Sequence, residues 1–196
     1  MTLSPSSLGR RYPYWVRPAG CSSLLVLLSA VWLWASGVNI APDAVTRATR
    51  GYNTFAGELA FLTDGLTPDN SERAGVFAWP TKGNLIFQFD TPRSVTGLRL
   101  RVGADAGSYG AFAYLGAEFG ESGQTETTDE SLVADAYDFE FQADTWVHLI
   151  FPDAAETDYI ELMTQSGAEF YEIEILAAVP ETTVVRALSW GKIKQR

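Results

Sequence analysis

Apart from carboxylates, the side chains that most often carry catalysis are scarce in this sequence. The chain has one His and one Cys, His148 and Cys21, so an intrachain disulfide and a zinc site built from several His and Cys are excluded. A Ser–His–acid triad would have to use His148, which stands in the strand-like run TWVHLIF without a nucleophile elbow. We therefore expect His148 to be an ordinary strand residue and the protein not to be an enzyme.

The remaining polar segments offer no defined reaction. The chain contains 24 Asp and Glu residues, so many that no particular two can be identified as the catalytic carboxylates of a glycosidase. The Gly-rich segment 103–110, GADAGSYG, lacks the Lys of a phosphate loop and is predicted to be a turn between strands. The polar segment 117–136 is either a solvated loop or an acidic docking site for a basic soluble partner.

The charges divide the chain into three parts. No Asp or Glu precedes Asp43, whereas Arg10, Arg11 and Arg17 do. No Lys or Arg occurs from 102 to 185, a stretch that holds 18 of the 24 acidic residues, and a basic arm follows at 181–196. The formal net charge of −10 argues against nucleic acid as a partner.

An uncharged run of 25 residues, 18–42, is long enough for a transmembrane helix, since a bilayer core of about 30 Å needs about 20 helical residues. The arginines before it place the segment 1–17 in the cytoplasm, so the body would be periplasmic and the protein a single-pass inner-membrane protein. Aromatic residues at both ends would mark the lipid interfaces: Tyr12, Tyr14, Trp15, Trp32 and Trp34.

Small residues recur along one face of this predicted span, where they would let another helix approach closely in lipid. The helix-packing residues expected on this basis are Ser22, Ser29, Ala30, Ser36 and Gly37. A cleaved signal peptide is the alternative, because Ala35, Ser36 and Gly37 could form its cleavage site. The long lead before the apolar run, with aromatic residues of its own, favours a retained anchor.

After a connector at 43–59, the pattern changes to the alternation of antiparallel strands. NLIFQFD (84–90) places Leu85, Phe87 and Phe89 on one face, and EFYEIEIL (169–176) alternates apolar residues with Glu172 and Glu174. Further strands are predicted at 95–102, 109–116, 138–142, 145–151 and 158–163. The sequence therefore predicts an all-β sandwich or jelly roll over 60–180.

The order of several motifs resembles the discoidin-type, galactose-binding-like β-sandwich. The turn L-T-D-G at 62–65 is followed by Trp79 and by the strand pair within 84–102. Trp146 and the closing segment 158–176 complete a resemblance that covers roughly residues 60–177. The resemblance implies a possible structural Ca²⁺ held by Asp64, Asp69 and Glu172, whose hard oxygens suit this ion. A plain turn with a solvent-facing Glu172 is the alternative.

Two functions follow from these features. The first is a non-catalytic accessory subunit of a larger membrane complex, for which we considered a bacterial photosynthetic reaction centre with its light-harvesting antenna; its partners would be membrane subunits and lipid. The second is a membrane-tethered carbohydrate-binding module, which the resemblance allows. For sugar contacts the sequence offers Phe77, Trp79, Arg73 and Lys82.

Overall fold

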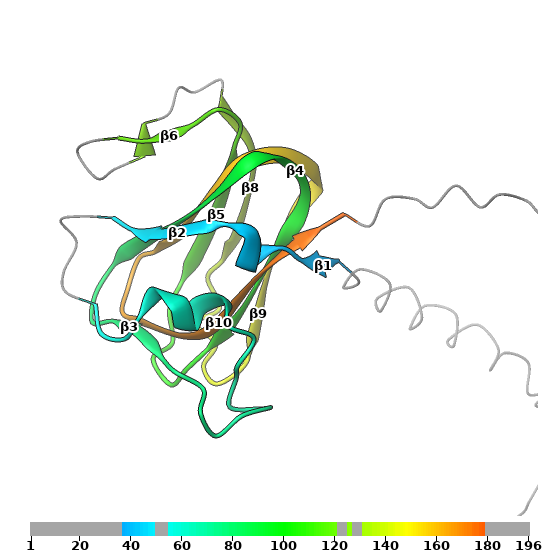
Figure 1. The fold of residues 1–196 in the computed structure, drawn as a ribbon. Coiled ribbons are helices and arrows are strands. Elements are labelled where there is room, and N and C mark those ends of the chain that lie inside the picture. The colour runs from blue at the N-terminus through cyan, green and yellow to red at the C-terminus, as the bar shows by residue number, and fades with distance from the viewer. Residues whose placement is uncertain (1–36, 50–54, 121–124, 127–130, 179–196) are drawn as a thin grey trace, which may run out of the picture. The chain divides into compact units, whose positions relative to one another are not determined.

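The computed structural model describes residues 37–49, 55–120, 125–126 and 131–178, and nearly all the regular structure in them is strand (Figure 1). The strands are β1 (Val38–Asn39), β2 (Val45–Ala48), β3 (Phe77–Trp79), β4 (Gly83–Val102), β5 (Tyr109–Tyr114), β6 (Glu118–Phe119), β7 (Thr125–Glu126), β8 (Leu132–Asp138), β9 (Trp146–Thr164) and β10 (Ala168–Ala177). Two 3₁₀ turns, η2 (Ala41–Asp43) and η3 (Leu59–Thr63), interrupt them. The prediction of an all-β antiparallel fold is confirmed. In the described part of the chain, no helix is long and apolar enough to cross a membrane.

Two long strands run through both layers of the sandwich. In one layer, the first half of β4 and the second half of β9 pair with each other, flanked by β2 on one side and by β5 and β8 on the other. In the other layer, the second half of β4 lies between β10 and the first half of β9. β3 pairs with the start of β10 and β1 pairs with its end. The strands predicted at 84–90 and 95–102 are therefore one continuous strand, as are those at 145–151 and 158–163.

β4 changes layer at an irregular stretch that requires a glycine. Its pairing with β9 shifts register between Gln88 and Arg93 and again between Val95 and Gly97. Gly97 has a φ of 149°, and a β carbon there would lie 2.3 Å from the carbonyl oxygen of Leu149. Glycine can adopt this conformation and allows the two backbones to approach, so it permits the bend.

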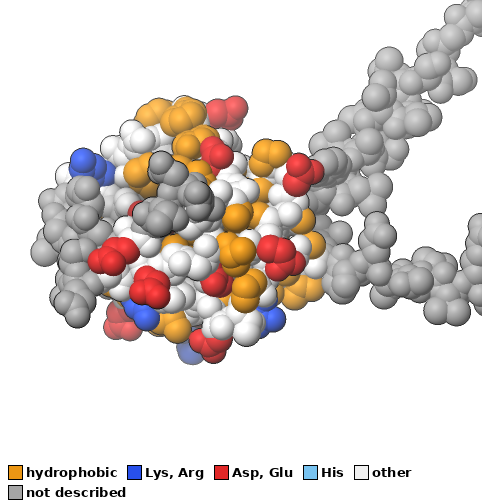
Figure 2. All heavy atoms as spheres, turned by 90° about the horizontal axis from the view of Figure 1, so that it is seen from above, with side chains coloured by type: hydrophobic (Ala, Val, Ile, Leu, Met, Phe, Trp, Pro, Cys, Tyr) orange, Lys and Arg blue, Asp and Glu red, His pale blue; other side chains and the backbone are white. Residues whose placement is uncertain are grey.

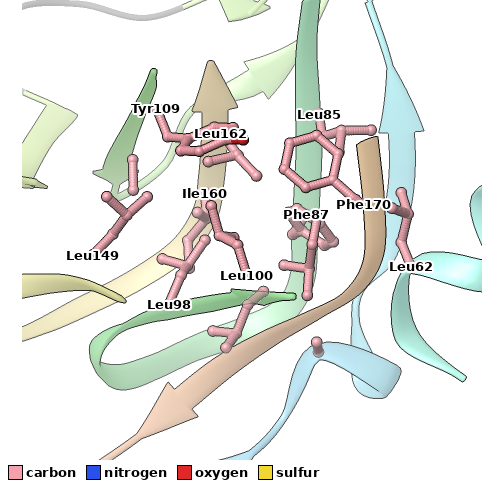
Figure 3. Close-up of a cluster of buried hydrophobic side chains, with 14 of the residues drawn as sticks. Leu62, Leu85, Phe87, Leu98, Leu100, Tyr109, Leu149, Ile160, Leu162 and Phe170 are labelled. Carbon is pink, nitrogen blue, oxygen red and sulfur yellow. The ribbon is translucent and has the colours of Figure 1, made fainter. Parts of the chain in front are cut away.

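Alternate residues of the long strands fill the space between the layers (Figure 3). Leu85, Phe87, Leu98 and Leu100 of β4 are fully buried, as the alternation predicts. Burial of each such side chain contributes about 1.5–3 kcal/mol to folding. The outer face of β4 also contains a fully buried residue, Ile86, which belongs to a second, smaller cluster with Ala117 and Tyr159.

The sandwich begins earlier than the sequence predicts. Val38 and Asn39, expected inside the membrane helix, pair with β10, and Ala41 is fully buried. Gly37, expected at a helix–helix contact, also lies against β10, because a β carbon there would be 2.8 Å from Cβ of Leu176. The expected connector 43–59 contains β2, which hydrogen-bonds to β4. The prediction failed because this segment shows no alternation.

The other residues expected in membrane contacts lie outside the described part of the chain: Tyr12, Tyr14, Trp15, Ser22, Ser29, Ala30, Trp32, Trp34 and Ser36. Further along, the polar segment 117–136 is not one loop, since β6, β7 and most of β8 lie within it. The strand expected at 138–142 is instead the end of β8 and the start of a loop.

Candidate functional site

Four connections between the two layers meet at one end of the sandwich, the lower end in Figure 1, which we call the loop end. They are the turn 80–82, the loop 103–108, the loop 139–145 and the turn 165–167. Residues 55–57 join them, because Ala56 forms a bridge with Ala78 of β3. Side chains from distant parts of the sequence are thus brought together.

A groove of about 340 Å³ opens at the loop end. It is lined by Phe55, Ala56, Ala78, Trp79, Pro80 and Asp105. The ring of Phe55 is 41% exposed and packs on the buried ring of Phe77, with centroids 4.8 Å apart. Phe55 thus presents an apolar surface that the core keeps in place.

Trp79, which lines the groove, has a hydrogen-bond donor without a partner in the described part of the chain. The residue is 1% exposed, and its Nε1–H is buried with no acceptor among the described residues. A β carbon at Gly83 would come within 2.5 Å of the indole, so glycine makes room for the ring. A buried donor without a partner costs about 1–3 kcal/mol.

Glu169 at the start of β10 holds Asp105 in the groove. Its Oε2 accepts the backbone N–H of Ala104 at 2.9 Å and that of Asp105 at 3.3 Å. The backbone carbonyl of Glu169 also accepts the N–H of Gly103 at 2.9 Å. The Asp105 side chain remains exposed as an acceptor. The groove therefore combines an apolar ring and an acceptor, with a buried donor, unpaired among the described residues, on a residue that lines it, and such groups suit the faces and hydroxyls of a polyol.

A second group of rings, which we call the aromatic platform, consists of Phe112, Tyr137 and Phe139. Tyr137 and Phe139 are stacked with centroids 5.8 Å apart, and Phe112 meets Tyr137 edge-on at 5.5 Å. Phe139 is 64% exposed and Tyr137 is 50% exposed. A β carbon at Gly110 would be 3.2 Å from both Phe112 and Tyr137, a tight contact that glycine avoids.

The loop 139–145 beside this platform is strained and internally bonded. Phe141 and Asp144 have φ values of 51° and 52°, a left-handed conformation that costs of order 1–3 kcal/mol for residues other than glycine. The side chain of Asp138 accepts the N–H of Glu140 at 2.9 Å. The N–H of Asp144 reaches the carbonyl of Gly103 at 2.8 Å. Phe141, on this left-handed backbone, is 54% exposed to solvent.

The loop end has an acidic character. Asp105, Asp138, Glu140 and Asp144 lie on its loops or where they begin, while the chain from 103 to 178 contributes no Lys or Arg. Figure 2 looks onto the opposite end, where acidic groups are scattered among hydrophobic side chains and Lys and Arg lie toward the margins. The loop end thus has four acidic residues on its loops or where they begin, together with Lys82 in the turn 80–82.

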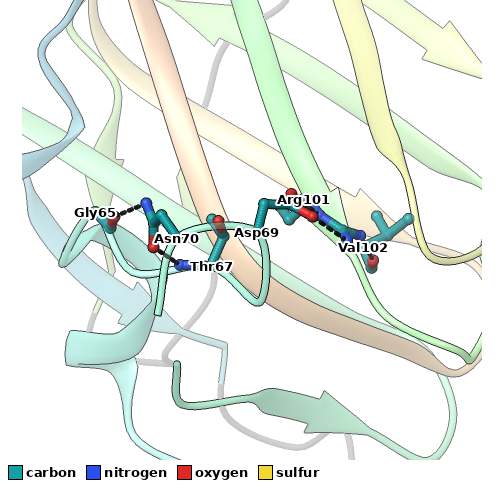
Figure 4. A network of polar contacts seen from close by, with 6 residues as sticks. All are labelled: Gly65, Thr67, Asp69, Asn70, Arg101 and Val102. Carbon is teal, nitrogen blue, oxygen red and sulfur yellow. Dashed lines mark hydrogen bonds and ion pairs between the residues drawn. The ribbon is translucent and has the colours of Figure 1, made fainter. Parts of the chain in front are cut away.

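The three residues considered for calcium do not form one cluster. Asp69 accepts two hydrogen bonds from Arg101, at 2.7 Å from Nε and 3.1 Å from Nη2 (Figure 4). These bonds lower the pKa of Asp69, and its carboxylate forms an ion pair with Arg101. Asn70 ties the same turn together by accepting the N–H of Thr67 and donating to the carbonyl of Gly65, both at 2.9 Å. Among the described residues, no group of three or more His, Cys, Asp and Glu could hold a metal ion.

Glu172 lies inside the protein and not in solvent. It is 2% exposed; its Oε2 accepts the N–H of Gly65 at 2.9 Å, while its Oε1 is buried without a partner in the described part of the chain. Burial raises the pKa of Glu172 to about 7; the Gly65 hydrogen bond opposes this shift and the Asp64 carboxylate adds to it. Glu172 therefore has a buried oxygen without a partner among the described residues, whereas the carboxylate of Asp69 is paired with Arg101.

Three other side chains named in the sequence analysis lie on strands or in the core. His148 is exposed and pairs in register with Arg99, and its pKa is lowered by partial burial and by that guanidinium. Phe77 and Trp79, considered for sugar contacts, are core residues, although Trp79 also lines the groove. The exposed rings of Phe55, Phe139 and Phe141 were missed, because no pattern marks Phe55 and because Phe139 and Phe141 have the spacing of a strand.

The chain is similar in fold to solved carbohydrate-binding proteins. No protein-family model matches it, and no curated protein matches it. A histidine mutant of the lectin binding domain of lectinolysin, in complex with Lewis b, superposes with a TM-score of 0.50 and 12% identity, over 72% of this chain and 97% of that chain. A fucose binding module of Streptococcus pneumoniae gives a TM-score of 0.49 and 14% identity, over 74% and 98%. A family 32 module of C. perfringens in complex with galactose gives 0.45 and 12%, over 71% and 97%.

At these identities the similarity establishes the fold alone. The described body of the chain has the β-sandwich fold of these solved domains, which is the fold that the resemblance of the motifs at 62–65, 84–102 and 158–176 implies. Nothing in these similarities points to a reaction-centre subunit.

Proposed function

We propose that this protein is a non-catalytic glycan-binding module whose binding site is the groove of Phe55, Trp79 and Asp105. The proposal rests on the groove, because its residues have the three kinds of group that bind a sugar ring. Phe55 would stack on the C–H face of the ring, the Nε1–H of Trp79 would donate to a sugar oxygen, and Asp105 would accept a hydroxyl. The solved modules of this fold, described with Lewis b, galactose and fucose, support the same class of ligand.

The test is a screen of the full-length protein in detergent against immobilised glycans, followed by titration calorimetry with the best ligand. Phe55→Ala should weaken binding at least about tenfold, since losing one stacked ring costs about 1–3 kcal/mol in comparable contacts. Asp105→Asn should weaken it as well. Leu115→Ala is the matched control, because Leu115 is 43% exposed and lies outside the groove. If both groove variants bind like the wild type, the site is wrong.

A membrane anchor within residues 18–36 would tether the module, and we include it in the proposal. The uncharged run and the arginines before it support this assignment, with the described sandwich starting directly after it at Gly37. On this view the module lies on the periplasmic side and displays its groove to external glycans. A glycosylation-site tag placed before residue 17 or after residue 178 would report which end is translocated, and modification of the N-terminal tag would contradict the orientation.

The proposal includes a single structural cation, at Glu172. Its buried, unpartnered Oε1 supports this assignment. Asp64, whose charge raises the pKa of Glu172, could complete the site with its second carboxylate oxygen, while its Oδ1 accepts the N–H of Leu66 at 2.8 Å. Such an ion would fix the turn 64–70 on β10 and would take no part in sugar chemistry.

A further inference from the structure

The outer edge of β8 has unusual features for a strand at the margin of a sheet. β8 has seven residues and pairs only with β5 among the described residues. Edge strands are usually short, or carry Lys or Pro that discourage pairing with other chains. β2, at the opposite margin of the same layer, fits this rule with four residues and Arg47. β8 has no Lys, Arg or Pro.

The side chains of β8 are also suited to a partner. Leu132, Val133 and Tyr137 are 41%, 44% and 50% exposed, and the stacked ring of Phe139 continues the apolar surface. Asp135 and Asp138 add two carboxylates on the same strand. An extended segment with apolar and basic side chains would satisfy the free backbone groups, the rings and the carboxylates together.

We infer that this edge of β8 binds the chain's own C-terminal arm, residues 181–196. The arm has the sequence ETTVVRALSWGKIKQR, with four basic residues and one acidic residue. Its Thr-Thr-Val-Val run favours a strand, and its Trp190 and basic side chains suit a surface of rings and carboxylates. Eighteen residues follow Ala178, the last described residue, more than the seven that β8 needs. A segment of the same chain also binds at high effective concentration.

Hydrogen exchange of the β8 amides tests this inference in the full-length protein in detergent. A chain that ends at Ala178 should exchange the amides of β8 at least about tenfold faster than the full chain, because hydrogen-bonded edge amides are released. A synthetic peptide of residues 181–196 should restore the protection, and high salt should weaken it. Equal exchange in the two chains would overturn the inference.

Two charge-reversal variants distinguish binding of the arm at β8 from binding of another segment or chain there. Asp135→Lys in the full chain should speed exchange in β8 as the truncation does, while Asp153→Lys, an equal change at another exposed site, should not. Unchanged exchange in β4 and β9 shows that the variants fold. If β8 is protected without the arm and only at high protein concentration, a second copy covers the edge and the inference is wrong.

Discussion

Glu172 shows how one buried carboxyl ties the stability of the fold to pH. Its pKa is about 7 in the folded protein, against 4.5 when exposed, so the folded state keeps a proton that the unfolded state releases. This contribution to stability is fully present below about pH 4.5 and is lost as the pH rises through about 7. Glu172→Gln, which stays neutral, should therefore be more stable than the wild type at pH 8 by about 1–3 kcal/mol and nearly equal to it at pH 4.

Urea unfolding at pH 4, 6 and 8 measures this difference. Glu156→Gln is the matched control, because Glu156 is exposed and the substitution removes the same charge. A difference between wild type and Glu172→Gln that does not grow with pH would show that the carboxyl is ionised in the fold.

Calcium should act through the same residue. Since a cation at the unpartnered Oε1 would replace the proton, millimolar Ca²⁺ at pH 8 should raise the melting temperature of the wild type by a few degrees. The rise should be lost in Glu172→Gln and kept in Asp69→Asn, whose carboxylate is held by Arg101. Thermal melts with Ca²⁺ and with EDTA check this, and identical curves would exclude the ion.

At the level of the elements, the glycine in the bend of β4 permits a close approach of two backbones. Gly97→Ala would force a β carbon to within 2.3 Å of the carbonyl oxygen of Leu149, so we expect a loss of more than about 3 kcal/mol. Gly116→Ala also places alanine at a positive φ, but with nothing within 4 Å, and should cost only about 1 kcal/mol. Equal losses in chemical denaturation would mean that strain and not the close approach requires Gly97.

The sequence predicts the strands well and the loop end poorly, for a physical reason. Leu85, Phe87, Leu98 and Leu100 alternate because one face of each strand is buried, and this periodicity is visible in the sequence. Phe139 and Phe141 show the same spacing in DFEFQ, yet β8 ends at Asp138, the backbone is left-handed at Phe141, and both rings are exposed. No local pattern marks Phe55, since only the bridge from Ala56 to Ala78 brings it to the groove.

In the whole molecule, the groove and the edge of β8 should act independently, because they use no residue in common. Phe55→Ala should therefore reduce glycan binding and leave the exchange of β8 unchanged. Tyr137→Ala should have the reverse effect. Measuring both properties for both variants checks this, and a variant that changes both would show that the loop end is one continuous site.

The most direct test of the glycan-binding proposal follows the indole N–H of Trp79 by NMR during a glycan titration of the ¹⁵N-labelled protein. Assignment by Trp79→Phe separates this signal from those of the other Trp residues. If a sugar oxygen accepts this hydrogen bond, the Trp79 signal should shift in a saturable way with the glycan selected by the screen, and Phe55→Ala should require a higher glycan concentration. A selected glycan that binds without moving this signal, or a full panel of glycans that does not bind at all, would contradict the proposed site.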